Sequence, residues 1–254
     1  MKTISNTIAA AEITLLLLAL PLHAATFTLN PSADAFVTTG PTANLSGNNY
    51  GGAGALSIAA PGLANGEFQS VMRFDLSGAR TSFDTQFGAG QWSIQSITLQ
   101  LTATSPNNAI FNASAAGQFG ISWMQNDSWV EGTGTPAAPA TTGITYSSLP
   151  SFLSAGDESL GIFSFGGGTS GNNSYSLALT SGFDADATAG NLVSVRLSAA
   201  DTTVSYLFDS RSFGTTGFRP LLTITAVPEP GVLSLLPAGA VLLLGARCRR
   251  NRHG

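Results

Sequence analysis

The fold is decided by residues 93–102, which have the sequence SIQSITLQLT. In this stretch the apolar residues Ile97, Leu99 and Leu101 alternate with polar ones. Successive side chains of a β-strand point to opposite faces of the sheet, so the alternation predicts a strand with one buried face and one wet face. Residues 191–197, with the sequence NLVSVRL, follow a similar pattern. We therefore expect an antiparallel sheet that covers a hydrophobic core.

Further short runs of this kind recur along residues 26–226, separated by Gly, Asn, Ser and Pro. The expected strands are Phe27–Leu29, Ala35–Thr38, Ala55–Ala59, Gln69–Leu76, Trp92–Thr104, Phe119–Met124, Ile144–Tyr146, Leu160–Phe165, Tyr175–Leu179, Leu192–Leu197, Val204–Phe208 and Leu221–Ala226. Many short strands between turn residues are typical of sandwiches and jelly rolls. The predicted fold is all-β, a single antiparallel β-sandwich (jelly-roll-like) ectodomain over residues 26–226, and no long amphipathic helix is expected.

The first 25 residues have the pattern of a secretory signal peptide. Lys2 supplies a positive charge, residues 8–22 are largely apolar, and small residues follow at Ala24 and Ala25. We expect cleavage after Ala24 or Ala25. The alternative is an uncleaved membrane anchor, for which the apolar run is short.

The C-terminal end also combines an apolar run with positive charge. Residues 232–246 are largely apolar, and the basic residues that follow are Arg247, Arg249, Arg250 and Arg252. Positive residues stay on the cytoplasmic side of a membrane, so we predict a transmembrane segment at 232–246 with a cytoplasmic basic stop. A helix of this length rises about 22 Å, less than the hydrocarbon thickness of about 30 Å, which suits a temporary retention signal.

The residues Val227, Pro228, Glu229 and Pro230 stand directly before this span. Together with the short apolar segment and the terminal arginines, they resemble the PEP-CTERM sorting tail over residues 227–254. The resemblance implies an inner-membrane intermediate and recognition by an exosortase-like transpeptidase that cuts near the motif. The body would then reach the cell surface or the surroundings of a Gram-negative bacterium, in association with exopolysaccharide or biofilm.

An ordinary linker before a plain anchor is the alternative interpretation of this motif. Its two prolines lack N–H donors and resist helix and sheet. We therefore expect the motif to stay extended and reachable at the membrane edge.

Removal of both ends leaves a body whose composition excludes many functions. The only Lys, the only Cys and both His residues are Lys2, Cys248, His23 and His253, so the body would hold none of these types. This excludes Ser-His-Asp catalysis and typical zinc or copper sites. Five arginines against twelve acids give the body a net charge of −7, which argues against nucleic-acid binding. We predict that the body is not an enzyme and binds no nucleic acid.

A second resemblance rests on motifs that follow one another along the body. They are Asp34-Ala-Phe-Val, Asn48-Asn-Tyr-Gly, Val71-Met-Arg-Phe-Asp-Leu, Ser96-Ile-Thr-Leu-Gln-Leu, Trp129-Val-Glu-Gly-Thr-Gly, Gly143-Ile-Thr-Tyr and Phe218-Arg-Pro-Leu-Leu-Thr-Ile. This order resembles the DNRLRE-type β-sandwich domain, which is similar to jelly-roll carbohydrate-binding modules. The resemblance implies a polysaccharide-binding body. The family usually carries more Lys and His, so a sugar site that uses cations is not implied.

Sugar sites of β-sandwiches combine an aromatic face with amides or carboxylates. The candidate ligand-binding residues are Trp123, Trp129, Tyr146, Asp127 and Glu131. The alternative for Trp123 and Trp129 is a place in the core. Arg73 is interpreted as a strand residue paired with an acid.

Carboxylates leave a catalytic alternative open, a glycan-active hydrolase or lyase. Asp127 with Glu131, or Asp157 with Glu158, could serve as its acid and base. The spacing along the chain does not fix their separation in space.

Asp184 and Asp186 lie in a Gly- and Ala-rich stretch that could hold a structural calcium ion. The alternative is that both are turn acids in water, and no other cofactor is predicted. Taken together, the sequence predicts an exported surface or matrix protein that acts as a structural or polysaccharide-binding module.

Overall fold

The structure is a computed structural model that describes residues 23–229 of the 254-residue chain. Several predicted features lie outside the described residues: most of the signal peptide, Pro230, the span 232–246 and the arginines 247, 249, 250 and 252. Within residues 23–229, neither α-helix is long and apolar enough to cross a membrane.

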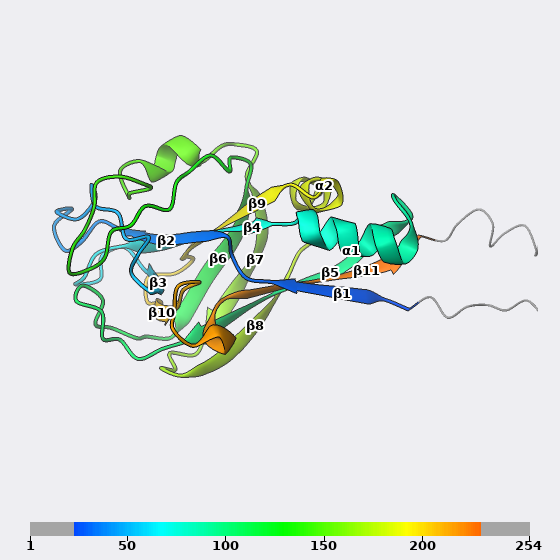
Figure 1. Cartoon of the computed structure of the whole chain (residues 1–254). Coiled ribbons are helices and arrows are strands. Elements are labelled where there is room, and N and C mark those ends of the chain that lie inside the picture. Colours follow the sequence, from blue (N-terminus) through cyan, green and yellow to red (C-terminus); the bar gives the residue numbers. More distant parts are fainter. Residues whose placement is uncertain (1–22, 230–254) are drawn as a thin grey trace, which may run out of the picture. The chain divides into compact units, whose positions relative to one another are not determined.

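Between Ala25 and Pro228, eleven antiparallel strands form one connected sheet (Figure 1). The strands are β1 Ala25–Leu29, β2 Ala33–Thr38, β3 Ala55–Ala59, β4 Phe68–Asp75, β5 Trp92–Ala103, β6 Gly117–Met124, β7 Glu158–Phe165, β8 Gly171–Leu177, β9 Leu192–Ala199, β10 Ser205–Asp209 and β11 Leu221–Pro228. Their order is β1-β11-β5-β10-β3-β4-β9-β6-β7, with β2 paired to β4 and β8 paired to β5.

Two weak links divide this sheet into blocks. One residue pair joins β10 to β5, and one residue pair joins β3 to β4. The main hydrophobic core takes side chains from all three blocks that these two links leave. The ring of Phe165 in β7, for example, stacks on Tyr206 in β10 with the centroids 3.7 Å apart. The predominantly β, antiparallel fold is therefore confirmed, and its packing is sandwich-like.

Strands β2 and β4 are buried on both faces. Phe36 and Met72 belong to the main core, whereas Val71 on the opposite face of β4 belongs to a second apolar cluster. Trp129 and Ile144 are also members of that second cluster. Both come from the long segment between β6 and β7, so this segment packs against the outer face of the sheet.

Strand β5 has the alternation that its sequence predicted. Ile97, Leu99 and Leu101 are buried, whereas Ser96 is exposed and Thr98 is half-buried. The strand pairs with β11 along residues 92–100 and with β8 along residues 97–103. It therefore lies inside the sheet and buries one face in the core, as expected.

Two short helices were not expected from the sequence. They are α1 Ser77–Phe87 and α2 Ser181–Ala189, and two single 3₁₀ turns are η1 Leu149–Phe152 and η2 Thr216–Phe218. Asp184 and Asp186 lie in α2 and not in a loop, which corrects that expectation. The predicted strand 144–146 is also wrong, because these residues form no strand and the N–H of Ile144 donates to the carbonyl of Val130 at 2.7 Å.

The two ends of the body lie side by side. Ala25 at the start of β1 is the register partner of Ala226 in β11. The pairing of β11 with β5 shifts in register between Thr225 and Ala226 and then continues to Pro228. The last strand thus extends two residues beyond the expected boundary at residue 226.

Candidate functional site

The indole of Trp129 is a core residue. Its side chain is 1% exposed, and its Nε1 donates to Oγ of Ser194 at 2.9 Å. The guanidinium carbon of Arg73 lies 4.9 Å from the ring centroid. With both faces covered, the ring offers no platform to a sugar, so the core alternative holds for this residue.

Trp123 is also buried, at 7% exposure. Its Nε1 donates to Oδ2 of Asp186 at 3.1 Å. Its ring lies over Gly182 in α2, where an added Cβ would come within 2.3 Å of Cζ3. The indole therefore fixes α2 to the sheet, and the core alternative holds here as well.

Tyr146 is half-buried and takes part in a chain of polar contacts. Its hydroxyl donates to Oε2 of Glu67 at 2.7 Å, and Oε1 of Glu67 accepts from Gln69 at 2.6 Å. Gln69 in turn accepts from Nε of Arg196 at 2.7 Å. Burial, and then the neighbouring Glu67, raise the pKa of Tyr146 to about 12. The Tyr146 hydroxyl therefore keeps its proton and donates it to Glu67 on the outer face of the sheet.

Asp127 and Glu131 have different partners. The carbonyl of Asp127 accepts from Nη1 of Arg73 at 2.8 Å, and burial raises the pKa of its carboxyl group. The same Nη1 donates to the carbonyl of Trp129 at 2.8 Å. Arg73 makes no ion pair with a described acid, so the expected acid partner is wrong. The arginine instead holds the backbone of the β6–β7 segment against β4.

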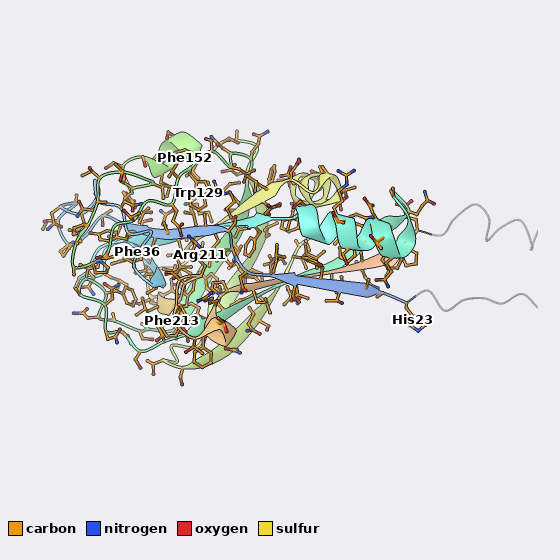
Figure 2. All side chains as sticks on the ribbon, in the orientation of Figure 1. His23, Phe36, Trp129, Phe152, Arg211 and Phe213 are labelled. Atoms are coloured by element: carbon orange, nitrogen blue, oxygen red, sulfur yellow. The ribbon has the colours of Figure 1, made fainter. Side chains whose placement is uncertain are left out.

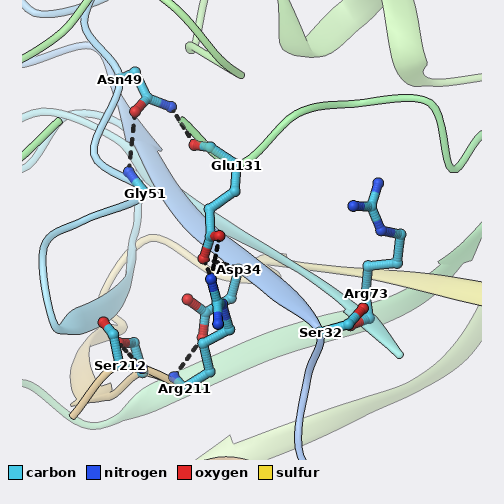
Figure 3. Close-up of polar contacts among 9 residues, drawn as sticks. Ser32, Asp34, Asn49, Gly51, Arg73, Glu131, Arg211 and Ser212 are labelled. Atoms are coloured by element: carbon cyan, nitrogen blue, oxygen red, sulfur yellow. Dashed lines mark hydrogen bonds and ion pairs between the residues drawn. The ribbon is translucent and has the colours of Figure 1, made fainter. Parts of the chain in front are cut away.

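Glu131 belongs to a polar network with Asp34 and Arg211 (Figure 3). Nε of Arg211 donates to Oε1 of Glu131 at 2.6 Å, and Nη2 donates to Oε2. Oε1 also accepts the backbone N–H of Asp34 at 3.1 Å. The backbone N–H of Arg211 donates to Oδ2 of Asp34 at 2.7 Å. Asp34 is buried to 1% exposure, and this burial raises its pKa to about 7.

Asn49 extends this network into the neighbouring loops. Its Nδ2 donates to the carbonyls of Glu131 at 2.6 Å and Ile144 at 2.8 Å. Its Oδ1 accepts the N–H groups of Gly51 and Gly134. A Cβ at Gly134 would lie 1.9 Å from the carbonyl oxygen of Asn49, so this close approach requires glycine.

The network therefore brings together Asp34, Asn49 and Glu131 from three separate sequence motifs. The sequence missed Arg211, although it is one of only five arginines in the body. One sequence feature could have indicated Arg211 as a site residue. It follows the predicted strand Val204–Phe208 closely, and a cation at a strand end can pair with an acid from a neighbouring loop.

A pocket of about 560 Å³ lies beside this network. It is lined by residues of four segments, at 53–55, 104–109, 135–137 and 207–214. Its polar side chains are Thr104, Asn107, Asn108, Thr135, Asp209 and Ser212. The volume falls within the range of about 300–1,000 Å³ that small-molecule sites occupy.

Asp209 has the least usual environment in this pocket. Its side chain is 2% exposed, and Oδ1 has no hydrogen-bond partner among the described residues. Burial raises the pKa of its carboxyl group to about 6. Nearby, the ring of Phe213 lines the pocket and lies 6.4 Å from the ring of Phe218, which is 46% exposed.

None of the five predicted ligand residues lines this pocket. The pocket was not predicted from the sequence because its members are scattered over four separate segments of strands and loops. The pocket and the network nevertheless share the segment 209–212. Asp209 and Ser212 line the pocket, whereas Arg211 between them bonds to Glu131 in the network.

The remaining candidate carboxylates accept hydrogen bonds from backbone and side-chain groups. Asp157 accepts the N–H groups of Gln125 and Ser154, and Glu158 accepts the N–H of Gly182 at 2.7 Å. Asp186 accepts from Trp123 and Asn191. Across residues 23–229, no group of three or more His, Cys, Asp or Glu side chains is placed to hold a metal ion.

Comparisons with known proteins add little to this geometry. No family model matches the chain, and no curated protein matches it. A solved structure described as Desmodium yellow mottle tymovirus has 8% identity and a TM-score of 0.25. That match covers 84% of this chain and 90% of the other, and a TM-score this low carries no argument.

Proposed function

We propose that this chain is an exported cell-surface or matrix protein, sorted by an exosortase-like transpeptidase, with a body that binds extracellular polysaccharide and serves no catalytic role. The pocket between the loops is the observation that carries the proposal. Binding sites are commonly built from loops on a rigid β-scaffold. Hydroxyl, amide and carboxylate groups beside an aromatic ring match the surface of a sugar, which is polar at its edge and apolar on its faces.

The placement of the chain ends supports this proposal. Ala25 and Ala226 are register partners, so the mature N-terminus and the sorting motif would leave the body together. Figure 2 shows Phe213 of the pocket away from the end of the sheet where β1 begins and β11 ends. The pocket therefore lies away from the point at which the tail would leave the body, which would leave it accessible to matrix polymers.

The charged groups favour binding over hydrolysis. Glycoside hydrolysis generally uses two carboxyl groups that flank the scissile bond. Asp209 is the one acid among the residues that line the pocket. Glu131 is held by Arg211, and the carboxylates of Asp157 and Glu158 accept structural hydrogen bonds. We therefore favour a polysaccharide-binding or structural module over the alternative of a glycan-active hydrolase or lyase.

The resemblances belong to the same proposal. The convergence of Asp34, Asn49 and Glu131 on one network supports the DNRLRE-type comparison, because it gives three of its motifs a common structural role. The jelly-roll connectivity and the association with biofilm are inferred from that resemblance and from the tail.

The sorting motif calls for one adjustment to the proposal. Val227 and Pro228 are paired with Ser93 and Trp92 of β5, and the N–H of Glu229 donates to the carbonyl of Gln91 at 2.9 Å. Val227 and Pro228 thus belong to strand β11, although the prolines of the motif were expected to resist sheet, and Pro230 lies outside the described residues. Processing near Pro228 and Glu229 would therefore require the end of β11 to separate from β5.

Sorting is tested by expressing the full chain in a Gram-negative host with an exosortase and in the same host after its deletion. Mass spectrometry of the surface-released protein should find a C-terminus near Glu229 only when the enzyme is present. A Glu229→Gln variant, which keeps the backbone contact, should slow this release. An intact Arg252 on the released protein would refute sorting by tail removal.

Polysaccharide binding is tested on the purified full chain in mild detergent against a panel of immobilised polysaccharides. Retention on at least one polymer, together with weaker biofilm in a deletion strain, is expected. Failure to bind any polymer, with unchanged biofilm, would refute this function.

A further inference from the structure

The pocket contains a carboxylate whose hydrogen bonding is incomplete. Oδ1 of Asp209 is shielded from solvent and has no partner within residues 23–229. A buried acceptor without a donor destabilises the fold, and more strongly when it is charged. A ligand that donates hydrogen bonds to this carboxylate would offset that cost.

Two other acids, Asp34 and Asp127, also have a buried Oδ1 without a partner, but neither lines the pocket. Asp201 accepts the N–H groups of Gln118, Thr203 and Val204. Oδ2 of Asp34 accepts the N–H of Arg211. Asp209 is therefore the acid that a molecule in this pocket would meet.

The rest of the wall offers complementary groups. Oδ1 of Asn108 accepts the N–H of Ile110 at 3.0 Å, which leaves its amide nitrogen as a donor toward other groups. Asn107, Thr104 and Ser212 add further amide and hydroxyl groups, and Phe213 adds an apolar ring. A sugar ring presents neighbouring hydroxyls that both donate and accept, together with apolar C–H faces, so it can use all of these groups.

Charge restricts the class of sugar. Among residues 23–229, no arginine lines the pocket. The Arg211 guanidinium is bonded to Glu131, and Nε of Arg219 donates to the carbonyl of Phe213. The body as a whole has a net charge of −7. A polymer of uronic acids would meet a carboxylate without a compensating cation, which disfavours its binding.

We propose that this pocket binds an uncharged sugar unit, with the Asp209 carboxylate accepting hydrogen bonds from neighbouring hydroxyls and the Phe213 ring packing against an apolar face of the sugar. The proposal rests on the polysaccharide-binding function proposed above and specifies its site and ligand class. Asn107 and Asn108 complete the polar edge.

The test measures affinity of the full chain for neutral polymers (dextran, galactan and mannan), for the amine polymer chitosan and for the anionic polymer alginate. Asp209→Asn keeps the size of the side chain but removes its charge. Asp184→Asn, in α2, removes the same charge outside the pocket and serves as the matched control. Because Asp209 forms no ion pair with a described residue, its variant should fold at least as stably as the parent, which thermal unfolding checks.

We expect binding to at least one neutral polymer, at least a tenfold loss in Asp209→Asn and no more than a twofold change in Asp184→Asn. A hydrogen bond to a charged group contributes about 1.5–3 kcal/mol, which corresponds to a loss of this size. Phe213→Ala should weaken binding to the same polymer.

The other outcomes separate the two proposals. Binding to a neutral polymer that survives Asp209→Asn would overturn the assigned site and leave polysaccharide binding intact. Binding only to alginate or only to chitosan would overturn the neutral-sugar assignment. Binding to no polymer would refute the proposed function itself.

Discussion

Arg211 and Glu131 form a two-pronged ion pair between segments that lie 80 positions apart in the sequence. Nε donates to Oε1 at 2.6 Å, and Nη2 donates to Oε2. Such bidentate contacts are among the stronger and more directional hydrogen bonds in proteins. Because Oε1 also accepts the N–H of Asp34, one carboxylate ties the β6–β7 segment, β2 and the β10–β11 loop together.

Replacing this carboxylate should therefore reduce stability. In Glu131→Gln, one bond from Arg211 loses its acceptor and the guanidinium loses its counter-charge, which we expect to cost roughly 2 kcal/mol. Urea unfolding measures the free energy. Asp184→Asn removes a single negative charge elsewhere and should change it little. Equal stability of Glu131→Gln and the parent would mean that the ion pair is not a structural anchor.

The sheet could be predicted from the sequence because one strand face is buried and the other is wet. Ile97, Leu99 and Leu101 alternate with polar residues, and the structure buries all three. The helices could not be predicted in the same way. Each helix buries only two residues, which are four positions apart: Ala79 and Phe83 in α1, and Phe183 and Ala187 in α2. Neither helix therefore has a long amphipathic pattern. A glycine with positive φ follows each helix, Gly88 after α1 and Gly190 after α2, and a glycine at this position is a local signal of a helix C-terminus.

The candidate site was less predictable. The motif order pointed to Asp34 and to Glu131, but it did not reveal that the two are joined through Arg211, because pairing across loops depends on the tertiary fold. Trp129 seemed a candidate sugar platform because tryptophan serves in both cores and binding sites. Only its burial and its bond to Ser194 decide between the two roles.

Stability should fall as the pH rises because of Asp34. Burial raises its pKa to about 7 in the folded protein, against an ordinary value of 3.8. Between these values the folded state keeps a proton that the unfolded chain has lost, so the free energy of unfolding decreases with pH and levels off above about 7. The slope is at most about 1.4 kcal/mol per pH unit for one such group. Asp209, with a pKa raised to about 6, acts in the same direction over the acidic part of the window.

Urea unfolding at pH 5, 6, 7 and 8 measures this slope. Asp34→Asn should flatten it between pH 6 and 7, because the amide can still accept the N–H of Arg211 but does not titrate. Asp75 and Glu158 have lowered pKa values, so their contributions to the stability of the protein are lost only when the pH falls into a more acidic range. A slope that is unchanged in Asp34→Asn would assign the effect to another group.

Trp129→Phe should destabilise the fold without affecting polysaccharide binding. The change leaves the buried hydroxyl of Ser194 without its indole donor and opens space in the second apolar cluster, which should cost roughly 2–3 kcal/mol. Trp92→Phe is a useful comparison, because its indole donates to Asp84 at 2.8 Å and that acid is partly exposed. We expect a smaller loss there. A loss of polymer affinity in Trp129→Phe at unchanged stability would restore its role as a ligand platform.

The end of β11 should contribute measurably to the stability of the body. A chain that ends at Ala226 lacks the pairing of Val227 and Pro228 with β5 and the bond from Glu229 to Gln91. At about 1 kcal/mol for each lost backbone hydrogen bond, the melting temperature should drop by roughly 2–6 °C relative to a chain that ends at Glu229. Differential scanning calorimetry of the two chains measures this difference. Identical melting temperatures would show that the terminal residues leave β5 at little cost, and separation of the strand end would then present no barrier to cleavage of the sorting motif.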